Sequence, residues 1–254
     1  MRILASNDDG FHALGINTLF DTLSLSHDVT MIAPNQERSS CGHGITLGEP
    51  IRIIQHHEKV FACSGYPADC VLIGLGHLFQ DKKPDLIVSG INHGANLGQD
   101  RFYSGTMAAA RESAFRGIPS IAVSLVTKPG DPDEYFQPVA NFVQKCLEAG
   151  IVNYIPAMCM ININAPNLPE EKLSGIKLTK VGFQQYSEEV VERVDTRGRN
   201  YYWVGGTYEG HQDIPGSDCN AVSEGFISVN LQCLNAEAVP AEAELNLENF
   251  LKSL

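Results

Sequence analysis

Short apolar runs alternate with helical patterns along the first two-thirds of the chain. Four runs are nearly continuous in apolar residues and end at polar or turn residues, which is typical of buried strands: 2–7, 29–33, 85–90 and 120–125. Helical spacing follows at about 14–25, 67–79, 105–116 and 133–149, and residues 45–64 have an extended pattern. This alternation predicts an α/β fold with a doubly wound, mostly parallel sheet and right-handed crossovers.

The pattern changes after about residue 165. Between residues 176 and 215 the chain carries Val190-Val191 and the aromatic run 201–204, separated by turn signals at Gly198 and Gly205-Gly206. These features predict a C-terminal β-hairpin extension, which we expect to form an arm for oligomer contacts. Residues 226–232 return to strand-like alternation, and the acidic tail from about 241 to 254 has weak helical spacing.

Two adjacent carboxylates, Asp8 and Asp9, follow directly after the first predicted strand. In open α/β sheets, ligands bind at the carboxyl edge of the strands. Ionised carboxylates held side by side repel each other, and a divalent cation or a shifted pKa relieves that repulsion. Because hard oxygen ligands favour Mg²⁺, Mn²⁺ or Ca²⁺, we expect a metal-centred phosphate site at this edge.

Two further loops follow predicted strands and are expected at the same edge. One contains Glu37-Arg38-Ser39-Ser40, and the other runs from residue 89 to residue 98 and leads to Ser104-Gly105-Thr106 at a helix start. Free backbone N–H groups and the helix dipole at such a start attract an anion. Each feature alone is weak, since loop glycines mostly serve turns and paired aspartates often cap helices. Three such loops at one edge together favour a functional site.

Composition limits the class of protein. The chain has 254 residues, of which 43% are hydrophobic and 19% charged, as expected for a globular protein with a sizeable core. We expect no membrane-spanning helix, because no run of about 18 apolar residues occurs, and no signal peptide, because the first residues form a strand. A net charge of −12 disfavours binding to a nucleic acid polymer but leaves room for a small phosphorylated ligand.

Seven cysteines, at positions 41, 63, 70, 146, 159, 219 and 233, are scattered along the chain and never form a C-x-x-C motif. An odd number with this spacing favours reduced thiols in a cytoplasmic protein. We therefore expect neither a disulfide framework nor a zinc site.

Several longer stretches together point to one family. They are NDDG (7–10), APNQERSS (33–40), SGYPADCV (64–71), SGINHGANLG (89–98), YSGTMAAARESAFRGIPSIAVS (103–124) and SDCNAVSEGFISVN (217–230). In these stretches the chain resembles the SurE family, the stationary-phase survival proteins, which are metal-dependent nucleotidases and acid phosphatases. The stretches lie in order over most of the chain, so the resemblance does not rest on a single motif.

The resemblance implies a set of site residues. One Mg²⁺ or Mn²⁺ ion per subunit would be held by Asp8, Asp9, Ser39 and Asn92. The phosphate pocket would be lined by Asn96, Ser104, Gly105 and Thr106. The catalytic residues would be Asp8, Asp9, Asn96, Ser104 and Thr106.

The resemblance also implies the fold, the assembly and the activity. The fold would be one Rossmann-like α/β domain over residues 1–254, with a core of about 1–165 and 216–240, a hairpin arm of about 176–215 and a C-terminal helix of about 241–254. Family members form dimers or tetramers by exchanging C-terminal segments. They hydrolyse nucleoside 5′- and 3′-monophosphates to nucleoside and phosphate, and some also act on short polyphosphate.

Two mechanisms remain open for such a site. In one, a metal-activated water attacks the phosphorus, Asp8 or Asp9 accepts its proton, and Ser104 and Thr106 stabilise charge on the phosphoryl oxygens. In the other, Asp8 attacks directly and forms an aspartyl-phosphate. Trapping with hydroxylamine distinguishes the two, because it captures only the acyl-phosphate.

Histidines and an arginine lie in or beside these loops. His12, His43 and His93 are candidate general acids near pH 7, although loop histidines are more often solvated or structural. Arg38 pairs either with phosphate or with an acid such as Glu37.

Other classes of protein fit the sequence less well. The glycines at 90, 94 and 98 lack the G-x-G-x-x-G spacing of a dinucleotide-binding loop. A phosphoacceptor signalling domain requires a third aspartate at the end of its central strand, and residues 50–62 contain none. A metal- or nucleotide-sensing module on a nucleotidase-like fold stays open, and metal-dependent turnover would exclude it.

Overall fold

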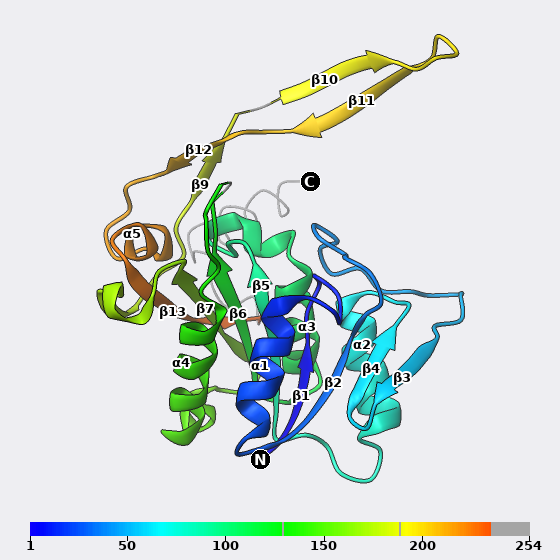
Figure 1. Cartoon of the computed structure of the whole chain (residues 1–254), viewed down its shortest axis with the longest axis vertical. Coiled ribbons are helices and arrows are strands. Elements are labelled where there is room, and N and C mark those ends of the chain that lie inside the picture. The colour runs from blue at the N-terminus through cyan, green and yellow to red at the C-terminus, as the bar shows by residue number, and fades with distance from the viewer. Residues whose placement is uncertain (129, 188, 235–254) are drawn as a thin grey trace, which may run out of the picture.

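The computed structural model describes residues 1–128, 130–187 and 189–234. Its centre is a nine-stranded sheet in the order β3-β4-β2-β1-β5-β6-β7-β13-β8 (Figure 1). Its strands are β1 (Arg2–Ser6), β2 (Asp28–Pro34), β3 (Ile53–His57), β4 (Val60–Cys63), β5 (Leu86–His93), β6 (Ser120–Val126), β7 (Cys159–Pro166), β8 (Gly175–Leu178) and β13 (Phe226–Cys233). The neighbours from β4 to β7 all pair in parallel, whereas β3 and β13 run antiparallel to β4 and β7. The predicted doubly wound, mostly parallel sheet is confirmed.

Helices cover both faces of this sheet. The longer ones are α1 (Leu14–Ser24), α2 (Pro67–Ile73), α3 (Gly105–Phe115) and α4 (Phe136–Glu148). The short ones are η1 (Gly74–Leu78), η2 (Gly98–Phe102), η3 (Ile151–Tyr154), η4 (Glu170–Lys172) and α5 (Asp218–Ser223). In Figure 1, α1 and α4 lie side by side on one face, and α2 and α3 pack together on the other. Within the described residues, no helix is long and apolar enough to cross a bilayer.

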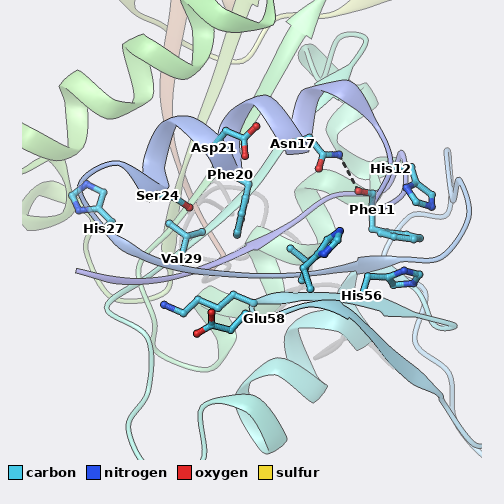
Figure 2. Close-up of a pocket in the computed structure, with 13 residues that line it drawn as sticks. Phe11, His12, Asn17, Phe20, Asp21, Ser24, His27, Val29, His56 and Glu58 are labelled. Atoms are coloured by element: carbon cyan, nitrogen blue, oxygen red, sulfur yellow. Dashed lines mark hydrogen bonds between the residues drawn. The ribbon is translucent and has the colours of Figure 1, made fainter.

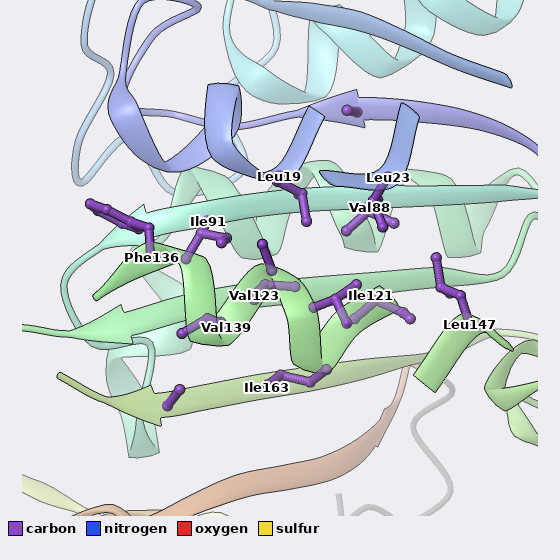
Figure 3. Packing of buried hydrophobic residues seen from close by; sticks show 14 of the residues in the cluster. Leu19, Leu23, Val88, Ile91, Ile121, Val123, Phe136, Val139, Leu147 and Ile163 are labelled. Carbon is purple, nitrogen blue, oxygen red and sulfur yellow. The ribbon is translucent and has the colours of Figure 1, made fainter. Parts of the chain in front are cut away.

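The core lies on both faces of the sheet, which explains why the strands are nearly continuous apolar runs. Successive residues of β1 point to opposite faces: Ile3 packs in the cluster under α1 and α4, and Leu4 packs in the cluster that includes Ala109 of α3. Figure 3 shows the first cluster, in which Leu19 of α1 and Val139 of α4 lie over the central strands. Burial on both sides holds the ends of β1 and β5 in fixed positions.

Strand β7 is absent from the sequence-based prediction, because Asn162 and Asn164 interrupt its apolar pattern although both are fully buried. β7 pairs with β13, and Cys159 and Cys233 lie opposite each other in this pair and form a disulfide. The expectation of reduced thiols throughout is therefore wrong for these two cysteines. They are 74 residues apart in the sequence, and only the strand register brings them together.

The C-terminal extension consists of two antiparallel ladders that project from the body (Figure 1). Their strands are β9 (Gln184–Tyr186), β10 (Glu189–Val194), β11 (Asn200–Gly205) and β12 (Tyr208–His211). β9 pairs with β12 near the body, and β10 pairs with β11 farther out. The predicted β-hairpins are thus present, while β8 joins the main sheet beside β13. The helix predicted at 241–254 lies outside the described residues.

Candidate active site

The centre of the sheet is a topological switch point. β1 and β5 are neighbours, and the chain continues from β1 through β2 to β4 on one side and from β5 through β6 to β7 on the other. In open α/β sheets, ligands bind in the crevice outside the carboxyl ends of the strands at such a point. Asp8 and Asp9 follow β1 here, and Asn92 lies near the end of β5.

Asp8 is held by the start of α3. Its side chain is buried, its Oδ2 accepts a hydrogen bond of 3.1 Å from the Gly105 backbone N–H, and its Oδ1 accepts one from the Thr106 hydroxyl. Ser104 caps the same helix, because its Oγ accepts from the Met107 N–H at 3.0 Å. The positive end of the helix dipole therefore faces the Asp8 carboxylate. Burial raises the pKa of Asp8 above its usual value, and the bonds from Thr106 and Gly105 oppose this shift.

Gly105 is required by the close approach of α3 to this carboxylate. A Cβ atom at position 105 would lie 2.7 Å from the Cβ of Asp8 and 2.8 Å from the Sγ of Cys41. Such distances are shorter than real Cβ contacts, so any side chain would push the helix away from Asp8. Cys41 also belongs to this site, although the sequence reasoning did not single it out.

Asp9 is more accessible than Asp8. Its Oδ2 accepts a hydrogen bond of 2.9 Å from the backbone N–H of His93, which links the loops after β1 and β5. Burial raises the pKa of Asp9 to about 6, the His93 N–H opposes this shift, and the charge of Asp8 adds to it. Asp9 lines a hollow of about 370 Å³ together with Glu37, Ser39 and His93.

The remaining predicted metal ligands lie around the two aspartates. Asn92 Oδ1 is 3.2 Å from the same Thr106 hydroxyl that donates to Asp8, so the structure brings Asn92 and Asp8 together. Ser39 lies in the hollow beside Asp9, where its hydroxyl donates to Glu37 Oε1 at 2.7 Å. The loop that carries Ser39 is tied to the site by the Arg38 N–H, which donates to the Asp8 carbonyl at 2.7 Å.

This donor set fits a hard divalent cation. Two carboxylates whose pKa values are raised by burial lie at one edge of the sheet, and hydroxyl and amide oxygens accompany them. A cation would supply the positive charge that these carboxylates lack, and all-oxygen ligands suit Mg²⁺ or Mn²⁺. Among the described residues, no group of three or more His, Cys, Asp or Glu side chains is placed to hold a metal. The site therefore depends on the neutral oxygens of Ser39 and Asn92 besides the aspartates.

Asn96 is fixed by a network that the sequence reasoning missed. Its side-chain N–H donates to Ser124 Oγ at 2.8 Å, and its backbone N–H donates to Asn164 Oδ1 at 2.8 Å. Asn162 donates to the Asn96 carbonyl at 2.9 Å. Among the described residues, no hydrogen bond joins Asn96 to Asp8, Ser104 or Thr106. The alternation of asparagine with isoleucine at 161–164 is the signal that points to this network.

The three histidines have different surroundings. His93 Nε2 lies 2.8 Å from Glu134 Oε1 at the rim of the site, and His43 Nε2 lies 3.1 Å from Glu112 Oε2. His12 stacks on Phe11, with ring centroids 3.7 Å apart, and lines a separate groove of about 520 Å³ between α1 and the β2–β4 edge (Figure 2). Among the hydrogen bonds of the described residues, His93 is the one of the three that reaches an aspartate of the site, through its backbone N–H to Asp9.

Arg38 and Tyr66 pack against each other. The guanidinium lies 5.0 Å from the centre of the Tyr66 ring and donates to the Ser64 carbonyl at 3.0 Å. Within the described part of the chain, Arg38 forms no ion pair with Glu37 or another acid. Its position instead fixes the loop that follows β2.

The fold and site together define a Rossmann-like α/β protein with a buried pair of carboxylates, capped by a helix start, at the switch point of its sheet. The family described as Survival protein SurE matches residues 3–188, and the chain belongs to this family.

Individual relatives match over nearly the whole chain. A 5′-nucleotidase SurE of Myxococcus xanthus is 45% identical over 221 residues, which cover 87% of this chain and 82% of that protein. A 5′-nucleotidase SurE of Vibrio campbellii is 41% identical over 254 residues, which cover 100% of this chain and 93% of the relative. The crystal structure of the SurE protein from Aquifex aeolicus has a TM-score of 0.85 and 34% identity, and it covers 99% of this chain and 100% of its own.

Proposed function

We propose that this protein is a metal-dependent nucleotidase that hydrolyses nucleoside 5′-monophosphates, and also 3′-monophosphates, to nucleoside and inorganic phosphate. The observation that carries the proposal is the pair Asp8 and Asp9, placed at the switch point of the sheet and against the start of α3. The relatives from Myxococcus xanthus and Vibrio campbellii, each named 5′-nucleotidase SurE, support the 5′ activity.

Asp8, Asp9, Ser39 and Asn92 would hold one Mg²⁺ or Mn²⁺ ion per subunit. A cation held there would polarise phosphoryl oxygens and would make hydroxide available from water near pH 7. Buried carboxylates favour this role, because their charge is otherwise uncompensated.

The protein's own groups would position the phosphate. The Gly105 N–H and the Thr106 hydroxyl donate to Asp8 and would hold this carboxylate beside the phosphate. The positive end of the α3 dipole would stabilise the charge that develops on the phosphoryl oxygens. Ser104 holds this turn of α3 through its cap, and Gly105 leaves room for the helix to approach. Asn96, fixed by β6 and β7, would bind a further phosphoryl oxygen.

Attack by water is favoured over attack by Asp8. Both oxygens of the Asp8 carboxylate accept hydrogen bonds from α3, and the side chain is only 4% exposed. Asp9 is less buried and accepts one N–H, so it is better placed to orient the attacking water and take its proton. Hydroxylamine added during turnover should therefore trap no acyl-phosphate at Asp8, and a captured adduct there would establish the covalent route.

The direct test measures inorganic phosphate released from AMP, GMP and 3′-AMP with Mn²⁺ or Mg²⁺, compared with the protein in excess chelator. Metal-dependent release from both classes of monophosphate is expected. Release from the 5′ compounds alone would contradict the proposed 3′ activity. If folded, metal-loaded protein released phosphate from none of them, a sensing module would be the better assignment.

A homodimer or homotetramer is also proposed, in a cytoplasmic setting and without a nucleic acid polymer or membrane as partner. The outer ladder of the arm supports self-association, because Val190, Trp203 and Val204 are 65%, 64% and 86% exposed. Light scattering after size-exclusion chromatography measures the mass in solution, and a monomer at all concentrations would contradict the proposal.

A further inference from the structure

A second hollow lies farther along the carboxyl edge of the sheet, beyond the ends of β6 and β7. We call it the distal pocket. Its volume is about 550 Å³, which falls in the range of about 300 to 1,000 Å³ typical of small-ligand sites. Its wall includes Leu97, Val126, Leu168, Tyr186, Tyr208 and Val222. These residues come from the loop before η2, from the strand ends, from the base of the arm and from α5.

Shared wall residues link the distal pocket to the candidate active site through a third hollow. An intermediate hollow of about 320 Å³ shares His93 and Glu134 with the hollow that contains Asp9. The same intermediate hollow shares Thr127, Lys128 and Asp131 with the distal pocket. The three hollows therefore form a row from Asp9 to the distal pocket along the edge of the sheet, and we call this row the trough.

The walls of the distal pocket suit a flat, uncharged ring system. Tyr186 and Tyr208 are 42% and 50% exposed, and their ring centroids lie 5.7 Å apart. The Tyr186 hydroxyl donates to the Asp100 carboxylate, which fixes the orientation of that ring. Nucleobases stack on exposed aromatic side chains, and aliphatic side chains such as Leu97 and Val126 cover the remaining apolar edge.

The charges around the distal pocket do not favour a phosphate. Its basic residues are Lys128 and His211, and the carboxylates of Asp100 and Asp131 lie in the same wall. An anion would meet both signs of charge here, whereas the positive end of the α3 dipole lies at the active site. The phosphate end of a ligand is therefore matched by the active site and the neutral end by the distal pocket.

Asn96 adjoins the distal pocket through its neighbours in the chain. It is a predicted phosphate residue, and its chain neighbours Ala95 and Leu97 both line the distal pocket. Its anchoring to Asn162 and Asn164 of β7 fixes the backbone between these two wall residues.

We infer that the distal pocket binds the nucleoside of a nucleoside monophosphate, with the base against the Tyr186–Tyr208 pair, while the phosphate lies at Asp9 and the start of α3. This inference rests on the proposed nucleotidase function, and it adds that the base is recognised mainly by stacking and apolar contact.

The test fills the distal pocket with a bulky side chain at either of two positions. Ser223 is the exposed last residue of α5, and Leu168 lies after β7; both line the pocket. Ser223→Trp and Leu168→Trp are compared with Ser24→Trp, which alters the exposed last residue of α1 in the separate groove of Figure 2. The readout is the ratio of kcat/KM for AMP to kcat/KM for p-nitrophenyl phosphate, a small ester with a reactive leaving group and no nucleoside. A second readout is binding of adenosine, measured by saturation-transfer NMR.

Both pocket variants should lower the AMP preference by about tenfold, mainly through KM, because contacts to the non-reacting nucleoside are lost. They should also lose adenosine binding, while Ser24→Trp keeps both properties. Unchanged preference together with unchanged adenosine binding in both pocket variants would overturn the inference. If the wild type releases phosphate from neither ester, the nucleotidase proposal fails. Adenosine binding then decides the inference by itself. The inference is upheld if only the pocket variants lose adenosine binding, and it is overturned otherwise.

Discussion

Thr106, the second residue of α3, donates its hydroxyl to the carboxylate of Asp8, 98 residues earlier at the end of β1. The same hydroxyl lies 3.2 Å from Asn92 Oδ1. One side chain thereby connects the end of β1, the end of β5 and the start of α3, and these three segments form the candidate site.

Removal of this hydroxyl should reduce turnover strongly. Thr106→Val keeps the shape of the side chain but removes the hydroxyl that donates to Asp8 and holds this carboxylate in place, so kcat should fall about 10- to 100-fold. Thr106→Ser keeps the hydroxyl and is the matched control. Steady-state kinetics with AMP measure both variants, and a Thr106→Val enzyme with wild-type kcat would remove Thr106 from the mechanism.

Ser104 combines a structural role with a proposed chemical one, and α5 offers a control for the structural part. Ser217 caps α5 in the same way, because its Oγ accepts from the Asn220 N–H at 3.1 Å. Ser104→Ala and Ser217→Ala should each lower the free energy of unfolding by about 1 kcal/mol through the lost cap. Only Ser104→Ala should also lower kcat. Equal kinetic effects of the two substitutions would mean that Ser104 acts only as a helix cap and has no chemical role.

The close contact of α3 with Asp8 makes position 105 intolerant of any side chain. Gly105→Ala should destabilise the protein by about 1 to 3 kcal/mol through overpacking and should weaken metal binding, because the new Cβ displaces Asp8. Gly76→Ala is the control, since a Cβ at Gly76 meets no atom within 4 Å. Thermal unfolding and Mn²⁺ titration report the two effects, and a Gly105→Ala protein with normal metal affinity would contradict this packing.

The raised pKa of Asp9 has a definite sign for the metal-free protein. Because burial raises its pKa to about 6 from 3.8, the folded state holds this proton more tightly than the unfolded state. The contribution of Asp9 protonation to the free energy of unfolding is complete below about pH 4 and is lost as the pH rises through about 6. In excess chelator, the wild type should therefore lose stability relative to Asp9→Asn as the pH rises. The melting temperature of Asp9→Asn minus that of the wild type should increase between pH 4.5 and pH 7.

Asp131→Asn provides the comparison for this pH dependence. Hydrogen bonds from Asn167 and from the Lys128 N–H lower the pKa of Asp131, so it is ionised in both states above about pH 5. The difference in melting temperature between Asp131→Asn and the wild type should stay constant from pH 5 to pH 7. A similar constant difference for Asp9→Asn would mean that Asp9 is not destabilised by burial.

The sequence allows prediction of the parts of the site that are local in the chain. Asp8 and Asp9 follow an apolar run directly, and Ser104 to Thr106 begin a helix with a capping residue, so their positions at the sheet edge follow from the order of elements. The doubly wound sheet follows from the same order.

Contacts that depend on strand register could not be predicted in this way. Strand β7 is not predicted because asparagines such as Asn162 and Asn164 are typical of loops. In the structure these two side chains are buried and hydrogen-bond the backbone of Asn96. The pairing of Cys159 with Cys233 likewise arises from the register of β7 with β13. Such residues lie far apart in the chain, and only the assembled sheet brings them together.

The most direct test of a metal-dependent nucleotidase site at Asp8 and Asp9 is the rate of phosphate release from AMP as Mn²⁺ is titrated into chelator-treated protein, for the wild type and for Asp9→Asn. We expect a rate that rises from zero and saturates at one Mn²⁺ per chain in the wild type, with no such rise for Asp9→Asn. A wild-type rate that does not depend on Mn²⁺, or an Asp9→Asn protein that matches the wild type at every Mn²⁺ concentration, would contradict this expectation.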